Sequence, residues 1–358
     1  MPSSTLPTTT RSSLQPVLLL GLVLLLLLAV GGSLISGAYP LSAHQAWQAL
    51  LAGPTSVGTS VDTSVGSSLS NAAGSELSTV VWQLRLPRIA AALLVGMALA
   101  TAGATYQAMF RNPLVSPDIL GVAAGAGLGA SFAILAGLPL VMVQFAAFGG
   151  GLLAVSCVVL VATRVRHHDP ILAMVLAGVA IGTLFAAGIS LVKVLADPSV
   201  QLPSITFWLL GGLHAITLTD LALVSPLLFG ALLPIWLLRW RINALSLSDD
   251  EAASIGVDVR RLRLILIACA TLMTASAVAI AGIIGWIGLV IPHAARLLAG
   301  AEFSRLLPAT LLLGGSFLLI ADSFARSVAA IELPLGILTA FVGAPAFLLL
   351  LARQGRSA

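Results

Sequence analysis

Residues 85–121 read RLPRIAAALLVGMALATAGATYQAMFRNPLVSPDILG, and this segment places the chain in a membrane. Between Arg88 and Arg111 it contains no charged residue. A hydrocarbon layer of about 30 Å is crossed by a helix of about 20 apolar residues. We therefore predict a membrane-spanning helix over residues 82–108.

The composition extends this prediction to the whole chain. Of 358 residues, 59% are hydrophobic and 8% are charged, and the mean hydropathy is +1.09, whereas about 25% of the residues of a soluble protein are charged. We predict an all-α polytopic membrane protein with about ten transmembrane helices. The predicted spans are 15–37, 82–108, 114–136, 138–163, 171–195, 217–239, 262–282, 283–298, 305–327 and 333–352. The eighth is short and carries Pro292, so we expect it to be tilted or broken.

These spans make residues 15–352 a single transmembrane domain between two tails, 1–14 and 353–358. The first apolar run could instead be a cleaved signal peptide, but its length and the spans that follow favour a retained helix. Residues 38–81 are expected to form an external loop, whose Gly/Ser/Thr-rich part, 53–78, is flexible. Cys157 and Cys269 lie inside apolar spans, which is typical of buried free cysteines rather than of a disulfide or a metal site.

The arginines predict the orientation. Loops on the cytoplasmic side of a membrane protein carry an excess of Lys and Arg. With the N-terminus inside, thirteen arginines fall on the cytoplasmic side, and only Arg85, Arg88, Lys193 and Arg326 fall on the other. Both termini are therefore predicted to be cytoplasmic. The basic pI of about 9.8 follows from this topology, and scattered arginines do not indicate nucleic-acid binding.

The chain lacks the residues that bind and hydrolyse ATP. Lys193 is its only lysine, and no G-x-x-x-x-G-K-[ST] segment surrounds it. We therefore expect no enzyme activity, no catalytic residues, no cofactor and no metal site, and ATP hydrolysis in a separate subunit. Proton-coupled secondary transport is the alternative class, and it needs ionisable residues inside the membrane. The acidic candidates, Asp118, Asp169, Asp197, Asp220, Asp322 and Glu332, all fall near predicted span ends.

A polar cytoplasmic segment, residues 243–259, is predicted to contain a short capped helix. Ser246 or Ser248 can cap it, and three acidic residues then occupy its first turn, where negative charge meets the positive end of the helix dipole. Small apolar residues follow, and Gly256 suits the helix end. The predicted coupling residues are Leu247, Ser248, Asp249, Asp250, Glu251, Ala252, Ala253, Ile255, Gly256 and Val257.

Four blocks in this order carry a resemblance to a known family. They are residues 85–121, FWLLGGL at 207–213, ALSLSDDEAASIGVDVRRLR at 244–263, and a bipartite block, WIGLVIPHAARLLAG at 286–300 and ADSFARSVAAIELPLGILTAFVGAPAF at 321–347. Together they resemble the permease subunit of the iron-siderophore, haem and cobalamin ABC importers, the FecCD type. The resemblance covers nearly all of the chain from Trp82 to Leu351.

The resemblance implies a type II ABC importer permease fold in the bacterial inner membrane. It also implies a homodimer with the translocation path between the two copies, two cytoplasmic ATPase subunits and an external substrate-binding protein. The coupling residues would dock into the ATPase, and Arg85, Arg88 and Arg326 would receive the binding protein. The expected cargo is a metal chelate, a ferric siderophore first, with haem, cobalamin or an oxyanion such as molybdate as alternatives. The loop at 53–78 and the pair His167–His168 depart from the family, so no gate residues are assigned.

Overall fold

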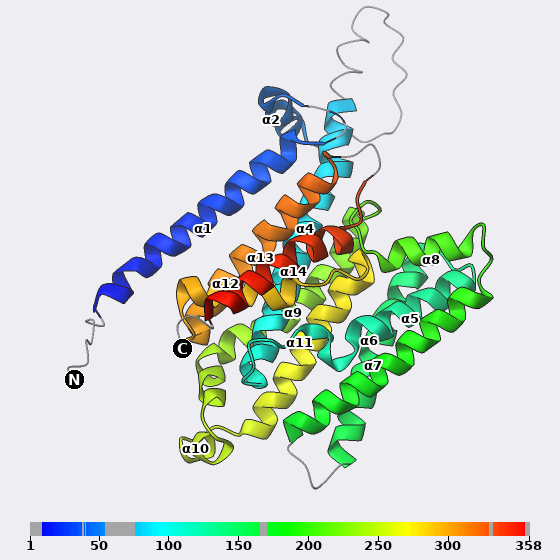
Figure 1. The fold of residues 1–358 in the computed structure, drawn as a ribbon. Coiled ribbons are helices and arrows are strands. Elements are labelled where there is room, and N and C mark those ends of the chain that lie inside the picture. The colour runs from blue at the N-terminus through cyan, green and yellow to red at the C-terminus, as the bar shows by residue number, and fades with distance from the viewer. Residues whose placement is uncertain are drawn as a thin grey trace, which may run out of the picture.

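The computed structural model describes residues 9–37, 39, 41–53, 76–164, 170–328 and 332–354, and within these ranges the regular structure is entirely helical (Figure 1). Most of the predicted flexible loop (54–75), the ends of both predicted tails (1–8 and 355–358) and the pair His167–His168 lie outside the described residues.

Seven helices in the described ranges are long and apolar enough to cross a membrane. They are α1 (Thr9–Ile35), α4 (Leu86–Met109), α6 (Leu140–Arg164), α7 (Pro170–Leu195), α9 (Leu218–Ile242), α11 (Val259–Ala281) and α13 (Phe303–Ala325). Three further apolar helices are α5 (Val122–Leu135), α12 (Ile287–Ala299) and α14 (Leu335–Gln354). Each predicted span thus corresponds to one apolar helix, which confirms the predicted all-α fold class.

Short helices connect the long ones. They are α2 (Ala43–Ala52), the π-helical turn η1 (Val80–Arg85), the 3₁₀ turns η2 (Pro117–Leu120) and η3 (Asn243–Ser246), α8 (Gln201–Leu209) and α10 (Asp249–Ser254). Figure 1 places α2 at one end of the bundle and α10 at the other, and the first turns of α1 and the last turns of α14 lie away from α2. We refer to these as the α2 end and the α10 end.

Two helices differ from the predicted spans. The helix expected over 114–136 begins only at Val122, because the preceding residues form a loop around η2. Pro117 opens that turn, and Gly121 follows it with a left-handed φ of 72°, so neither residue continues a regular helix. The eighth span was expected to be tilted or broken at Pro292, and of these two alternatives the break is absent, because α12 continues through Pro292.

Glycines let the helices approach closely. A Cβ atom on Gly125 would lie 2.4 Å from the carbonyl oxygen of Gly150 in α6, and one on Gly129 would lie 2.1 Å from that of Ala146. The same relation joins α4 to α13, where a Cβ on Gly96 would lie 2.3 Å from the carbonyl oxygen of Gly314. Larger residues at these positions would separate the helices.

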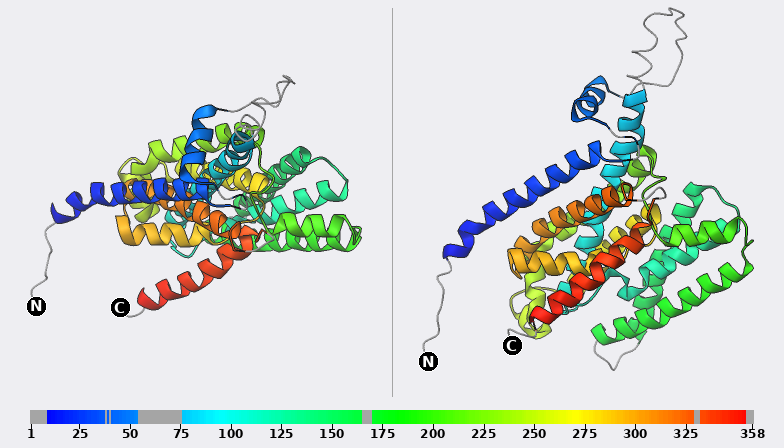
Figure 2. Two further views of the ribbon diagram at one scale, coloured as in Figure 1. Left: turned by 90° about the horizontal axis from the view of Figure 1, so that it is seen from above. Right: turned by 45° about the horizontal axis from the view of Figure 1, so that its top comes forward.

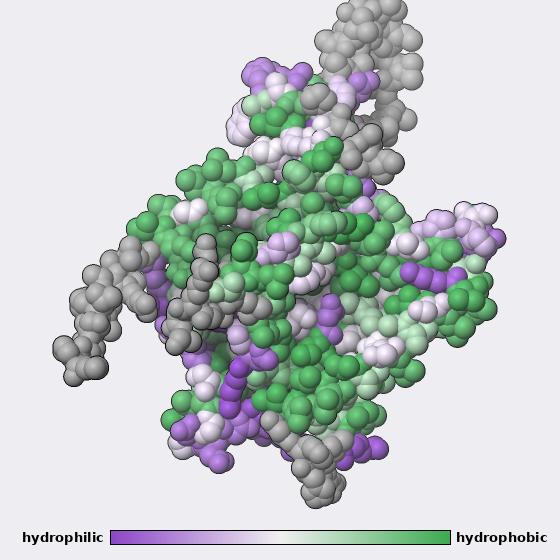
Figure 3. Space-filling model, viewed as in Figure 1, coloured by the Kyte–Doolittle hydropathy of each residue, from purple (hydrophilic) through white to green (hydrophobic). Residues whose placement is uncertain are grey.

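The outer surface of the bundle is apolar. Leucines such as Leu24, Leu184 and Leu237 are exposed on α1, α7 and α9, as lipid contact requires. Figure 3 shows hydrophobic surface over much of one face and hydrophilic residues gathered over α2 and α10. On this face α14 and α7 both lie in front, and the view from above in Figure 2 agrees with that placement.

Candidate coupling and docking sites

The helix α10 forms as predicted, with Ser248 rather than Ser246 as its cap. The hydroxyl of Ser248 accepts a hydrogen bond from the amide of Glu251, and the amide of Ser248 donates to the Glu251 carboxylate at 2.9 Å. This reciprocal pair satisfies two amides that a helix start leaves without partners. The same contacts with Ser248 hold the pKa of Glu251 below its usual value.

Asp249 attaches α10 to the bundle. Its carboxylate forms an ion pair of 2.8 Å with Arg263 in α11 and one of 3.0 Å with Arg111. Hydrogen bonding to Arg263, together with the charges of Arg263 and Arg111, lowers the pKa of Asp249 and outweighs the opposing desolvation. Arg111, which has a φ of 51°, also donates from Nε to the carbonyl oxygen of Leu245 at 2.6 Å. Contacts with Arg111, which follows α4, and with Arg263 in α11 therefore hold α10 in position.

The predicted coupling residues divide into a buried and an exposed set. Ala252 packs into the core, and Val257 is half-buried. Ile255 keeps 62% of its surface exposed, and Leu247 and Ala253 are exposed with it. Gly256, with a φ of 82°, ends the segment as predicted. The result is a short polar helix at the α10 end, and the exposed aliphatic side chain of Ile255 follows it directly.

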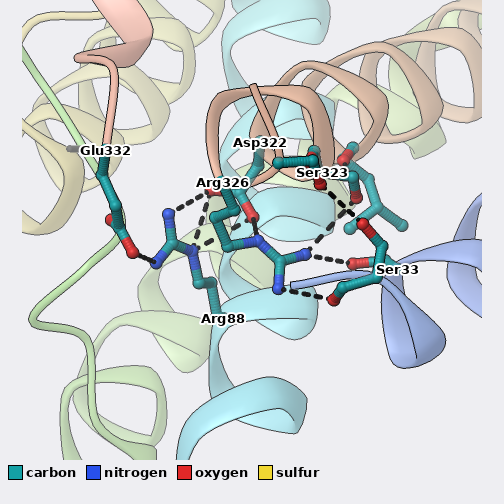
Figure 4. A network of polar contacts seen from close by, with 9 residues as sticks. Ser33, Arg88, Asp322, Ser323, Arg326 and Glu332 are labelled. Atoms are coloured by element: carbon teal, nitrogen blue, oxygen red, sulfur yellow. Dashed lines mark hydrogen bonds and ion pairs between the residues drawn. The ribbon is translucent and has the colours of Figure 1, made fainter. Parts of the chain in front are cut away.

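The predicted docking arginines come together at the α2 end, but their guanidinium groups are largely inside the protein. Arg88 is 12% exposed and forms ion pairs of 2.9 Å with both Asp322 and Glu332. Arg326 is 8% exposed, lies 3.1 Å from the same Asp322 carboxylate and donates to the Ser33 hydroxyl at 2.7 Å. Figure 4 shows Arg88 and Arg326 on either side of Asp322, with Glu332 on the outer side of Arg88.

Arg85 contributes to the same region from the π-helical turn. It is buried and donates to the carbonyl oxygens of Leu34 and Tyr39. The three arginines thus tie α1, α4, α13 and the segment before α14 together. Sequence reasoning placed these arginines at one end but missed their partners Ser33, Asp322 and Glu332. The i, i+4 spacing of Asp322 and Arg326 in a helix was the available signal.

A hollow lies between α8 and α14 and continues into the bundle. Its wider part, ≈ 610 Å³, is lined by Leu209, Gly285, Trp286, Gly336 and Phe341, among others. A deeper part of ≈ 260 Å³ shares Ile283, Gly285 and Trp286 with it. Trp286 has a φ of 70°, a strained value for a non-glycine residue. No sequence signal indicated this strain.

The deeper part of the hollow contains Asp118, which we had expected near a span end. It lies instead at the depth of the middle of the helices. Leu99, near the middle of α4, lines the same cavity, and a Cβ on Gly178, near the middle of α7, would lie 2.0 Å from the carbonyl oxygen of Ile119. The reason is the loop around η2, which enters the bundle before α5 begins. Across the described ranges, His, Cys, Asp and Glu form no group of three that could hold a metal ion.

The ten apolar helices of the described ranges, the capped helix α10 at one end and the hollow beside α14 are those of a polytopic membrane protein with a cavity that enters its bundle. The sequence profile described as the FecCD transport family matches residues 22–353. The chain therefore belongs to the FecCD transport family and is the permease of an ABC importer.

Several relatives match along most of their length. The molybdate import system permease protein MolB of Haemophilus influenzae is 39% identical, with 93% of this chain and 94% of that protein covered. The hemin transport system permease protein HmuU of Yersinia pestis is 34% identical, with 95% and 97% covered. A probable iron chelatin transport system permease protein of Helicobacter pylori is 42% identical, with 77% and 83% covered.

A solved structure matches the fold. It is described as an inward-facing conformation of a metal-chelate type ABC transporter, and it superposes with a TM-score of 0.81 at 36% identity. The match covers 94% of this chain and 99% of that one.

Proposed function

We propose that this chain forms the translocation path for a metal chelate, a ferric siderophore first, as a homodimer with two cytoplasmic ATPases and an external binding protein. The observation that carries the proposal is that α10 is held to the bundle through Asp249 and is followed directly by Ile255, which is exposed beside Leu247 and Ala253. An exposed aliphatic side chain on a fixed helix suits insertion into a groove of a partner protein.

The orientation is part of the proposal. We assign the α10 end to the cytoplasm, because Arg111, Arg239, Arg261 and Arg305 all lie in or beside the connections at that end. The α2 end then faces outward. Both chain termini are assigned to the cytoplasm on the same grounds, in a bacterial inner membrane.

The outer end is proposed to receive the binding protein at Arg85, Arg88 and Arg326. Arg88 and Arg326 pair with two carboxylates, Asp322 and Glu332, and Arg85 adds a third positive charge, so the cluster keeps a net positive charge. Glu332 is 47% exposed and holds Arg88 from the outside. An acidic side chain of the binding protein could take the place of Glu332 on Arg88, with no change in the buried pair of Arg88 and Asp322.

The names of the relatives support a metal-containing cargo, but they refer to different cargoes. Their names refer to iron chelatin, hemin and molybdate. Molybdate is the second candidate, because its permease is among the relatives that match nearly the whole chain. Uptake of ⁵⁵Fe-labelled siderophore against ⁹⁹Mo-labelled molybdate, by vesicles carrying the complete transporter, separates the two. Transport of molybdate alone would overturn the siderophore assignment.

The coupling role is tested with matched variants at the two ends. Ile255→Glu should prevent co-purification of the cytoplasmic ATPase and abolish transport. Leu51→Glu makes the same change at an exposed aliphatic residue of α2, and it should leave ATPase recruitment intact. Undiminished recruitment by the Ile255 variant would contradict the proposal, and transport driven by a pH gradient in ATPase-free vesicles would favour a secondary transporter.

A further inference from the structure

Asp118 is an exposed carboxylate at the deep end of the hollow between α8 and α14. Charged side chains are rare within the membrane domain of a protein, and where they occur they mark binding sites or ion pathways. In the described part of the chain, no arginine, lysine or histidine forms an ion pair with Asp118. Its charge is therefore not neutralised by a neighbour within one copy of the protein.

The cavity around Asp118 is lined by both polar and apolar residues. Ser116 and Thr274 line the same cavity, together with Leu99 and Trp286. The Thr274 hydroxyl donates its hydrogen to the Ala270 carbonyl, which leaves its oxygen as an acceptor. The cavity thus offers a carboxylate and hydroxyl oxygens, and these bind cations or hydrogen-bond donors.

A purely structural role for Asp118 explains only part of this arrangement. The amide of Ala123, in the first turn of α5, donates to Oδ1 of Asp118 at 3.3 Å. That contact helps to cap α5, and an asparagine would supply the same acceptor. It does not require a charge, nor does it explain why the carboxylate is exposed to the hollow.

The size of the cavity limits what Asp118 can bind. About 260 Å³ is below the range of about 300–1,000 Å³ for sites that enclose a drug-sized ligand. The wider part of the hollow, ≈ 610 Å³, opens beside α14 (Figure 1), and we take this opening to face the path between two copies. A chelate in that path would meet Asp118 with one edge rather than be enclosed by it.

We propose that Asp118 makes the middle of the translocation path electronegative, so that the path favours chelates that present positive charge or hydrogen-bond donors over polyanionic chelates. In a homodimer the two copies of Asp118 would act on one cargo. This inference rests on the proposed function, because it needs the hollow to be part of the path. It narrows the cargo from metal chelates in general to neutral or cationic ones.

The local potential can be measured without knowing the cargo. After replacement of Cys157 and Cys269 by alanine, Gly285→Cys places a reporter thiol that lines both parts of the hollow, where a Cβ meets no atom within 4 Å. The probes are a cationic and an anionic methanethiosulfonate, applied to the detergent-solubilised protein. The readout is the ratio of their two modification rates, in which any change in the pKa of the thiol cancels.

Asp118→Asn should lower the cationic-to-anionic rate ratio about tenfold, because a unit charge a few ångströms away in a partly desolvated site shifts each rate in the opposite direction. Asp197→Asn removes a charge from the connection between α7 and α8, outside the hollow, and should leave the ratio unchanged. Ser116→Cys serves as a second reporter if the first variant is poorly folded.

Two results would overturn the inference. An unchanged ratio at both reporters means that the carboxylate does not shape the path. A thiol that neither reagent modifies means that the hollow is closed to water. Neither result depends on the ATPase. The rate ratio therefore tests the inference about Asp118, whereas ATPase recruitment by the Ile255 variant tests the proposed function.

Discussion

The guanidinium group of Arg88 lies 2.9 Å from the carboxylate of Asp322, a side chain with no exposed surface, although 234 positions separate the two residues. Asp322 also faces Arg326, so one buried carboxylate holds two largely buried arginines. Such a group cannot be removed without leaving buried charge behind.

We expect Asp322→Ala to destabilise the protein by about 3–5 kcal/mol, because the buried side chains of Arg88 and Arg326 would lose their shared counter-charge. Glu332→Ala removes the exposed partner of Arg88 and should cost about 0–1 kcal/mol. Thermal unfolding of the detergent-solubilised protein measures both. Equal effects of the two changes would show that the burial of the Asp322 pair contributes nothing.

The contact between α4 and α12 depends on two glycines. A Cβ on Gly103 would lie 1.9 Å from the carbonyl oxygen of Gly288, so Gly103→Ala must push the helices apart. We expect Gly103→Ala to lower the free energy of unfolding by about 1–3 kcal/mol or more. Gly230 in α9 has no atom within 4 Å of a Cβ, and Gly230→Ala should stabilise the protein by about 0.5–1 kcal/mol. A stability screen of both variants that finds no difference would contradict the close approach.

Local signals in the sequence predicted α10 almost completely, whereas the sequence did not predict the long-range contacts. The capping serine and the acidic first turn lie within four residues of each other, so a reader of the sequence sees both. The predicted start of α5 was wrong. Leu114, Val115 and Leu120 are as apolar as the residues of a spanning helix, so hydropathy does not distinguish a helix from a loop that enters the bundle. The i, i+4 spacing signals the pair of Asp322 with Arg326, but the pairing of Asp322 with Arg88, 234 positions away, is a property of the folded chain and has no local signature.

The attachment of α10 through Asp249 should depend on pH. Its pKa is lowered in the folded protein, so its ion pairs contribute stability above the normal carboxyl pKa and lose it as the pH falls through the lowered value. The protection of the α10 amides, taken relative to the intrinsic exchange rate at each pH, should therefore be high at neutral pH and fall only in acid. Asp249→Asn should accelerate exchange at neutral pH, whereas Asp250→Asn, in the same turn and outside these ion pairs, should not. Equal protection in both variants would show that the ion pairs do not hold the helix.

The docking proposal can be tested without disturbing the buried network. Glu332→Gln removes the exposed carboxylate that competes for Arg88, so an acidic binding protein should associate several-fold faster at low salt, with a steeper salt dependence. Glu76→Gln changes the net charge by the same amount, at an exposed residue that begins the helix leading to Arg85 and Arg88, and it should have a smaller effect. Association with the reconstituted transporter across a salt series gives the comparison. If the two variants behave alike, general attraction explains the rate; if neither changes it, Arg85, Arg88 and Arg326 hold the helices together and do not receive the binding protein.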